Sequence, residues 1–274
     1  MSLKTPPEVA VEACVAARKK SEWTVSQMAI LGGLAGAYIA LAGYLYAIVT
    51  QDAATFSGIG VSRFLGGSVF SLGLILVVLA GAELFTGNCL MPLGSLAGCV
   101  SVKSLLRNWF WVYLSNLAGS LLVVAILFGA GLLQGPIGVH LLKISAAKVS
   151  LPFTQALLRG ILCNWLVVLG VWMAMAATDV TGKILAIYFP IMAFVASGFE
   201  HCIANMFFIP AGILASWNPE IVASAGLPEG KLAIVNVSGF LHNLLPVTIG
   251  NIIGGALFVA VLYYVVYKER VRAS

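Results

Sequence analysis

Residues 197–210 read SGFEHCIANMFFIP, and they set Glu200 and His201 side by side in a run that is otherwise apolar. An ionisable side chain at membrane depth is costly unless it faces a cavity or a partner. The apolar segment around this stretch, residues 184–216, is too long for one ordinary spanning helix and too short for two with a loop between them. It therefore predicts a membrane-spanning helix that is broken near Glu200.

The composition is that of an integral membrane protein. Of the 274 residues, 61% are hydrophobic and 9% are charged, and the mean hydropathy is +1.02. The net charge of +5 comes from basic residues scattered near the ends of apolar segments, so no basic patch for nucleic acid is predicted. The first 23 residues lack the apolar core of a secretory signal, and we expect an amphipathic helix over residues 7–20.

Six membrane crossings account for the apolar segments. Four segments have the length of about 20 residues that one spanning helix needs, and they cover residues 28–49, 108–133, 154–177 and 246–267. The second and fifth crossings, residues 64–100 and 184–216, each carry polar residues near the middle. A bilayer tolerates loosened backbone only where it is buried in protein or lines a cavity. We expect an all-α membrane protein with six transmembrane helices, of which the second and fifth are broken.

The distribution of Lys and Arg predicts the orientation. Six crossings put both termini on one side, and that side carries ten basic residues against five on the other. An excess of basic residues marks the cytoplasmic side. The prediction is a protein of the cell membrane with a cytoplasmic segment over residues 1–27, a single six-helix domain over residues 28–267 and a cytoplasmic tail over residues 268–274.

An internal repeat relates residues 28–133 to residues 154–267. Glu83 and Asn88 stand five residues apart, as do Glu200 and Asn205, so the pattern ExxxxN recurs 117 residues later. NLAGSLL at 116–122 likewise matches NIIGGAL at 251–257. Each half has three predicted crossings, so the second copy enters the membrane inverted relative to the first. Inverted 3+3 repeats place a translocation path between the halves, which predicts a transport protein.

His201 is the best candidate for contact with a transported molecule, because His140 and His242 fall at or near outer loops. A neutral imidazole offers one donor and one acceptor, and a protonated one offers two donors and a charge. The ring can therefore hydrogen-bond an anion or exchange a proton with it. Thr86, at the first break, would offer a hydroxyl near His201. Lys148, in an outer loop, is either an ordinary solvated lysine or a charge that attracts anions to the external mouth.

Four polar residues at the breaks are interpreted as structural. Side chains of adjacent helical residues point about 100° apart, so Glu200 and His201 cannot both face one small pore. We expect Glu83 and Glu200 to accept hydrogen bonds from opened backbone or to bridge to a neighbouring helix, with proton shuttling as the alternative. Asn88 and Asn205 are expected to bond backbone that is freed at the same breaks.

The sequence favours neither a metal site nor an enzyme, and we expect no cofactor. The five cysteines are isolated, lack metal-binding spacing and are expected to be small buried apolar side chains. An intramembrane metalloenzyme that uses Glu200, His201 and Cys202 is the alternative from another class, but three consecutive helical residues make a poor ligand set. A water or glycerol pore would need paired Asn-Pro-Ala motifs, where this chain has TGN and IAN.

Four long motifs resemble the formate/nitrite transporter family. They are SLGLILVVLAGAELFTGN at 71–88, NWFWVYLSNLAGSLL at 108–122, FVASGFEHCIANMFFIPAGI at 194–213 and NLLPVTIGNIIGGAL at 243–257. They occur in the family's order, and the resemblance extends over residues 7–267. It implies an aquaporin-like protomer with six spans that assembles in the lipid bilayer as a homopentamer, each protomer with its own pore.

The resemblance also implies roles for individual residues. It makes His201 the central pore histidine and Thr86 its neighbour. It places Asn164 close to the histidine and identifies Lys148 as a vestibule lysine. The hydrophobic constrictions that it implies are formed by Leu74, Leu84 and Phe194, joined by Phe70 towards the outer side.

A channel or transporter for small monovalent anions is the implied function. Formate leads because GAELFTGN and SGFEHCIANMFFIP look closest to the formate-type members, while nitrite is the alternative and hydrosulfide and short carboxylates stay open. A bare anion loses a large hydration free energy when it enters an apolar ring, whereas the neutral acid loses far less. Either His201 and backbone dipoles stabilise the anion, or a proton joins it before it crosses. The motifs do not separate a passive channel from transport coupled to H+.

Overall fold

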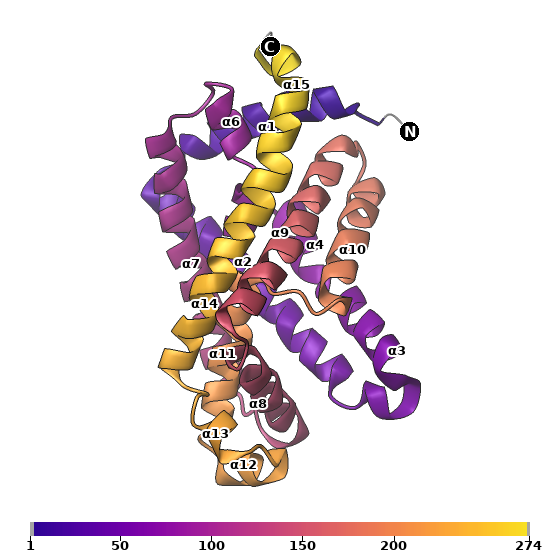
Figure 1. The fold of residues 1–274 in the computed structure, drawn as a ribbon, viewed down its shortest axis with the longest axis vertical. Coiled ribbons are helices and arrows are strands. Elements are labelled where there is room, and N and C mark those ends of the chain that lie inside the picture. The colour runs from indigo at the N-terminus through magenta and orange to yellow at the C-terminus, as the bar shows by residue number, and fades with distance from the viewer. Residues whose placement is uncertain (1–2, 273–274) are drawn as a thin grey trace.

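The computed structural model describes residues 3–272, and this part of the chain folds into helices with no named β-strand (Figure 1). The first half contains α1 (Pro6–Ser21), α2 (Val25–Thr50), α3 (Ala53–Phe70), α4 (Leu72–Ala80), α5 (Phe85–Asn88), α6 (Pro92–Leu96) and α7 (Val102–Gly129). The second half contains α8 (Gly135–Val149), α9 (Phe153–Ala176), α10 (Val180–Ala196), α11 (Cys202–Ala215), α12 (Pro219–Ala225), α13 (Glu229–Leu232), α14 (Val237–Ile252), a π-helical segment (Ile253–Val261) and α15 (Leu262–Arg272). The predicted all-α class is confirmed for these residues.

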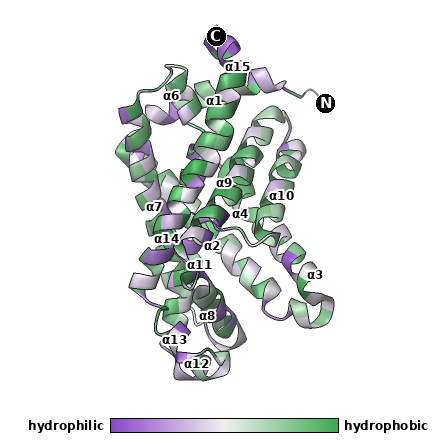
Figure 2. Ribbon diagram, in the orientation of Figure 1, coloured by the Kyte–Doolittle hydropathy of each residue, from purple (hydrophilic) through white to green (hydrophobic). Residues whose placement is uncertain are grey.

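Five helical segments are long and apolar enough to cross a membrane, and they cover Val25–Thr50, Ala53–Ala80, Val102–Gly129, Phe153–Ala176 and Val237–Arg272. α11 and α12 provide a sixth if two helices that meet at 109° count as one span, and α10 is a shorter apolar helix. Figure 2 shows that the helices are mostly hydrophobic along their length, with hydrophilic residues at the two ends of the molecule and also near its centre. Length and composition within residues 3–272 therefore allow five or six crossings.

Two long helices begin earlier than the hydropathy pattern predicts, because polar side chains cap them. Ser101 accepts a hydrogen bond from a backbone N–H of the first turn, so α7 begins at Val102 and not at residue 108. Asn236 does the same at the last long helix, which begins at Val237 and not at residue 246. Such caps satisfy amides that have no partner inside the helix. Hydropathy does not register them.

α1 lies across the end of the molecule at which both chain termini are found (Figure 1). It is one residue longer at each end than the helix predicted over residues 7–20, and it packs against α15. The backbone N–H and the hydroxyl of Thr5 donate to the Glu8 carboxylate, which holds the pKa of that carboxyl below its ordinary value. One face of α1 is buried and consists of Val9, Ala10, Ala13, Cys14 and Ala17.

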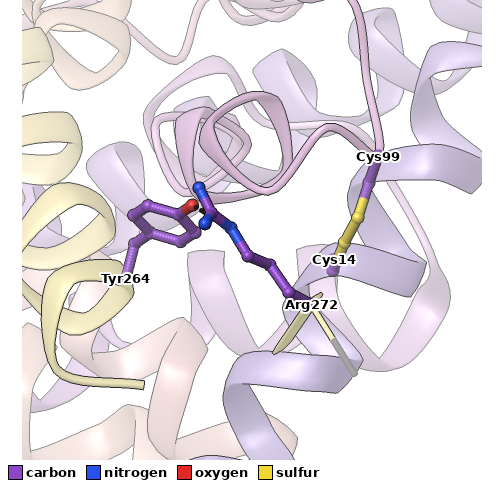
Figure 3. Close-up of a disulfide and its surroundings, with 4 residues drawn as sticks. All are labelled: Cys14, Cys99, Tyr264 and Arg272. Atoms are coloured by element: carbon purple, nitrogen blue, oxygen red, sulfur yellow. Dashed lines mark hydrogen bonds between the residues drawn. A yellow bond between two sulfur atoms is a disulfide. The ribbon is translucent and has the colours of Figure 1, made fainter. Parts of the chain in front are cut away.

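A disulfide joins Cys14 of α1 to Cys99 in the segment between α6 and α7 (Figure 3). The expectation that all five cysteines are isolated apolar side chains is therefore wrong for this pair. The two residues are 85 positions apart in the sequence, and they meet because α1 packs against α6. The other three, Cys89, Cys163 and Cys202, are free and buried as expected.

Small residues let α2 approach α7 closely. A Cβ added to Gly119 of α7 would lie 1.9 Å from the carbonyl oxygen of Gly33 in α2. A Cβ added to Gly36 would lie 2.0 Å from the carbonyl oxygen of Asn116. Between membrane helices there is little hydrophobic drive to associate, so close backbone packing supplies much of the attraction. The α2–α7 contact therefore depends on glycine at these two positions.

Gly119→Ala is expected to destabilise the protein by about 1–3 kcal/mol, the usual cost of inserting a methyl group into a packed contact. Gly33→Ala is the matched control, since a Cβ there meets nothing within 4 Å. Thermal unfolding in detergent measures both variants. A Gly119→Ala protein as stable as the Gly33→Ala protein would contradict the close contact.

Candidate functional site

Two interruptions of helix meet near the centre of the molecule. α4 ends at Ala80 and α5 begins at Phe85, while α10 ends at Ala196 and α11 begins at Cys202. Each interruption contains a glycine in the left-handed region near its start, with φ of 83° at Gly81 and 73° at Gly198, a conformation that costs glycine little. We call residues 81–84 the first break and residues 197–201 the second break. Thr86 Oγ1, just after the first, lies 2.9 Å from Nε2 of His201 in the second.

An asparagine from a neighbouring helix holds the first break. Oδ1 of Asn116 in α7 accepts the backbone N–H of Phe85 at 2.9 Å. Its Nδ2 donates to the carbonyl oxygens of Gly32 and Glu83 at 2.8 and 2.9 Å. The N–H of Glu83 donates to the carbonyl oxygen of Leu31 at 3.1 Å. The backbone N–H groups of Glu83 and Phe85 and the carbonyl of Glu83 are therefore paired within the protein.

Asn251 holds the second break in the same way. Its Oδ1 accepts the backbone N–H of Cys202 at 2.8 Å. Its Nδ2 donates to the carbonyl oxygens of Gly160 and Glu200 at 2.8 and 2.9 Å. The N–H of Glu200 donates to the carbonyl oxygen of Arg159 at 3.3 Å. These four bonds match the four bonds at the first break.

Beside the first break, a lysine, a glutamate and two asparagines form a buried polar network. Lys20 Nζ donates to Glu83 Oε1 at 2.6 Å and to Asn88 Oδ1 at 2.9 Å. Asn88 Nδ2 donates to Glu83 Oε2 and to Asn108 Oδ1, both at 2.8 Å. Both oxygens of the Glu83 carboxylate are thus occupied by side-chain donors.

An equivalent network stands beside the second break. Lys148 Nζ donates to Glu200 Oε1 at 2.9 Å, and its side chain is only 15% exposed. Asn205 Nδ2 donates to Glu200 Oε2 and to Asn243 Oδ1, both at 2.7 Å, and Asn243 Nδ2 donates to the Lys148 carbonyl at 2.9 Å. Lys148 is therefore an ion-paired, largely buried cation rather than a free vestibule charge.

The expected bridge from Glu83 and Glu200 to a neighbouring helix is found, whereas the expectation for the two asparagines is wrong. Glu83 and Glu200 bind side chains of Lys and Asn, and Asn88 and Asn205 donate to those carboxylates and to a further asparagine instead of to backbone. The residues that bond the opened backbone were missed by the sequence reasoning. These missed residues and their network partners are Asn108, Asn116, Asn243 and Asn251. The signal was present, because Asn108 precedes Asn116 by eight residues, as Asn243 precedes Asn251.

The hydrogen bonds of His201 fix its tautomer. Nδ1 accepts the backbone N–H of Ala204 at 3.1 Å, so His201 caps α11 and Nδ1 carries no proton. A neutral ring then holds its proton on Nε2, which donates to Thr86 Oγ1. The Thr86 hydroxyl keeps its own proton to donate. Asn164 lies close by, and its Nδ2 donates to the carbonyl oxygens of Thr86 and Asn251 at 3.2 and 2.7 Å.

Two cavities approach this polar centre from opposite ends. The α1-side cavity has a volume of about 340 Å³ and reaches Leu74 and Leu84. The α8-side cavity has a volume of about 240 Å³ and reaches Phe70, Phe194 and His201. The rings of Phe70 and Phe194 lie 6.0 Å apart edge to face, and Phe194 stacks on His201 at 5.8 Å. The four apolar side chains expected at constrictions thus divide into a leucine pair and a phenylalanine pair, one at each cavity.

The predicted site residues are brought together by this arrangement. His201, Thr86 and Asn164 form the polar centre, and all three are buried. Lys148 lines the α8-side cavity, where it pairs with Glu200. Among residues 3–272, no group of three or more His, Cys, Asp and Glu side chains is placed to hold a metal ion.

Comparison with known proteins identifies relatives along nearly the whole chain. The sequence model of the family described as "Formate/nitrite transporter" matches residues 7–265. The "Probable formate transporter" of Methanothermobacter thermautotrophicus is 42% identical over 286 residues, covering 98% of each chain. The "Formate channel FocA" of Escherichia coli K12 is 39% identical over 239 residues, covering 85% of this chain and 84% of that one. The solved structure "Pentameric formate channel with formate bound" superposes with a TM-score of 0.79 at 39% identity, covering 89% of this chain and 98% of the other.

Asn251→Ala is expected to destabilise the protein by about 2–5 kcal/mol. The substitution leaves three backbone groups without a partner, and each such group costs about 1–3 kcal/mol. Relaxation of the surrounding structure recovers part of this cost. Asn116→Ala should cost a similar amount. The control is Asn218→Ala, which removes an exposed cap of α12 and should cost about 1 kcal/mol. Thermal unfolding in detergent compares the three, and equal losses would refute the supporting role of Asn116 and Asn251.

Proposed function

This chain belongs to the formate/nitrite transporter family, and we propose that it conducts small monovalent anions across a membrane, with formate as the leading substrate. The observation that carries the proposal is the buried pair of Thr86 and His201, with a cavity leading towards it from each end and an apolar pair of side chains at each cavity. Relatives described as a formate transporter and a formate channel support formate. The family consists of transporters and channels, so the chain is not an enzyme.

We propose that six crossings form an aquaporin-like inverted repeat with broken second and fifth helices. Support comes from the two breaks, whose networks use the same residue types for largely the same hydrogen bonds, although the bond from Lys20 to Asn88 has no counterpart at Asn205. The half-repeats cover about residues 28–133 and 154–267. The excess of Lys and Arg places residues 1–27 and 268–274 in the cytoplasm, so the α1-side cavity faces inwards and the α8-side cavity outwards.

We propose a homopentamer with a pore in each protomer. One structural neighbour is described as a pentameric formate channel, and it covers 89% of this chain. Large apolar side chains are exposed on the long helices of a single chain, among them Leu41, Phe110, Leu122 and Phe189. In the assembly these faces would be covered by lipid or by neighbouring protomers.

Permeation follows from the order of the groups along the path. Phe70 and Phe194 on one side, and Leu74 and Leu84 on the other, strip water from the permeating species. Between them the Thr86 hydroxyl can donate to an oxygen of the substrate, and the positive end of the α11 dipole lies at His201. Hydrogen bonding at the centre thereby offsets part of the dehydration cost.

A proton joins the anion before it crosses the apolar pairs in this mechanism. The neutral acid loses far less hydration energy than the anion. Protonating His201 at Nδ1 would break its bond to the Ala204 N–H and leave a positive charge on a buried ring without a carboxylate bonded to it, which disfavours His201 as the proton carrier. The proton is therefore taken up in the α8-side cavity before the apolar pairs are reached, and His201 serves as a hydrogen-bonding group.

Uptake of labelled formate into proteoliposomes at several external pH values tests this mechanism. Wild-type uptake should rise as the external pH falls, because more of the substrate is neutral acid. His201→Ala and Thr86→Val should lower uptake about tenfold at every pH, since one lost buried hydrogen bond costs about 1–3 kcal/mol, while the pH dependence persists.

His242→Ala is the matched control, because this histidine is exposed at the outer end of the last long helix. If uptake by the wild-type protein does not change with external pH, the neutral-acid step is wrong. Equal uptake by the His201→Ala and His242→Ala proteins would remove His201 from the site. Competition by nitrite and hydrosulfide ranks the substrates.

A further inference from the structure

Two cationic side chains line the α8-side cavity, and only one of them is neutralised. Lys148 pairs with Glu200 at 2.9 Å, so this pair carries no net charge. Arg159 lines the same cavity, has an exposed side chain and forms no salt bridge within residues 3–272. Glu200 is the one carboxylate among the described lining residues. The cavity therefore has a net positive charge that resides on Arg159.

The backbone fixes Arg159 at the edge of the second break. Its carbonyl oxygen accepts the N–H of Glu200 at 3.3 Å, and the next carbonyl, that of Gly160, accepts from Asn251 at 2.8 Å. The backbone of Arg159 is therefore held beside Glu200, the residue that precedes His201. Arg159 lines the α8-side cavity together with Phe70 and Phe194.

We propose that Arg159 is the anion-collecting and shape-selecting residue of the outer mouth, an inference that rests on the proposed function. A guanidinium presents a planar fork of N–H donors that matches two oxygens of a carboxylate or of nitrite. Hydrosulfide has no second acceptor atom and gains only the charge attraction. Arg159 thus raises the local concentration of small anions and favours those with two oxygens.

Formate uptake as a function of concentration tests the role of Arg159. Arg159→Leu should raise the KM for formate about tenfold with little change in the maximal rate, because the polar centre is untouched. Arg159→Lys should restore most of the KM but should lose at least half of the preference for formate over hydrosulfide. Arg63→Leu is the matched control, an exposed arginine that does not line the cavity, and should resemble wild type.

The outcomes separate this inference from the proposed function. If Arg159→Leu and Arg63→Leu proteins have the same KM while wild type transports formate, the role of Arg159 is overturned and the proposed function stands. If Arg159→Lys keeps the full preference for formate, the shape selection is wrong. A wild-type protein that transports no small anion overturns both proposals.

The disulfide between Cys14 and Cys99 supports a separate inference about α1. α1 contributes Glu12, Lys19 and Lys20 to the wall of the α1-side cavity. It is held there by the Lys20–Glu83 pair, by a hydrogen bond from Lys4 N to the Ala176 carbonyl and by the disulfide (Figure 3). Cys14 is buried, whereas Cys99 is half-buried and open to attack from solvent.

In the proposed orientation this disulfide faces the reducing cytoplasm, where disulfides are rare and are commonly redox-sensing. We infer that it is a redox-sensitive tether of α1. A thiolate of a protein dithiol attacks the Cys99 sulfur, Cys14 leaves as a thiol, and the second thiol of the dithiol then releases Cys99. Two electrons and two protons pass to the cysteine pair, and the dithiol becomes a disulfide.

Reduction weakens the docking of α1, because the disulfide no longer constrains a loop closed by residues 85 apart. When α1 leaves, Lys20 leaves with it, and Glu83 stays buried without its cation. The polar network beside the first break then lacks its cation, while Asn116 still pairs the backbone of the break, so the reduced protein conducts less than the oxidised one.

Trypsin digestion and formate flux, each with and without dithiothreitol, test the tether. Reduction should speed cleavage after Arg18 and Lys19 at least fivefold and lower flux at least twofold. Cys14→Ser protein should show the reduced behaviour in both conditions, and Cys163→Ser, a buried free cysteine, should respond as wild type does. Unchanged cleavage and flux in wild type, or two free thiols in untreated protein, would overturn the tether without touching anion conduction.

Discussion

The polar centre depends on the pairing of backbone groups at two interruptions of helix. No water is available within the hydrocarbon core of a membrane to satisfy an open N–H or C=O. Asn116 and Asn251 pair these groups at the two breaks. The side-chain amide of each asparagine accepts the first backbone N–H after the break and donates to two backbone carbonyls. With these bonds in place, Thr86 and His201 can be held at the centre without a continuous helix around them.

The two Lys–Glu networks place charge at the edges of the site while keeping the centre neutral. A buried ion pair contributes little net stability, but an unpaired buried charge is very costly. Lys20 with Glu83 and Lys148 with Glu200 therefore constrain where α1 and α8 dock. This pairing leaves Arg159 as the cation of the α8-side cavity that is not neutralised by a carboxylate among the described residues.

The bond between His201 Nδ1 and the Ala204 N–H links architecture to chemistry. It caps α11, and it also determines that the free side of the ring carries a donor facing Thr86. A group used as a helix cap is a poor proton carrier, because binding a second proton would break the cap. The histidine that looked titratable from its residue type is thus set up as a hydrogen-bonding residue.

The sequence by itself determined the helical class, the position of both breaks and most of the polar centre. The hydropathy of a segment indicates that it lies in lipid, and the ExxxxN repeat indicates a hydrogen bond between residues about one and a half turns apart. Both can therefore be recognised from the order of residues along the chain. Only the tertiary structure decided which distant partners complete the site. Asn116 and Asn251 reach the breaks from other helices, Lys148 is neutralised by Glu200, and Cys14 meets Cys99 across 85 residues. These pairings depend on how the helices pack, and no pattern of neighbouring residues predicts which residues far apart in the sequence will meet.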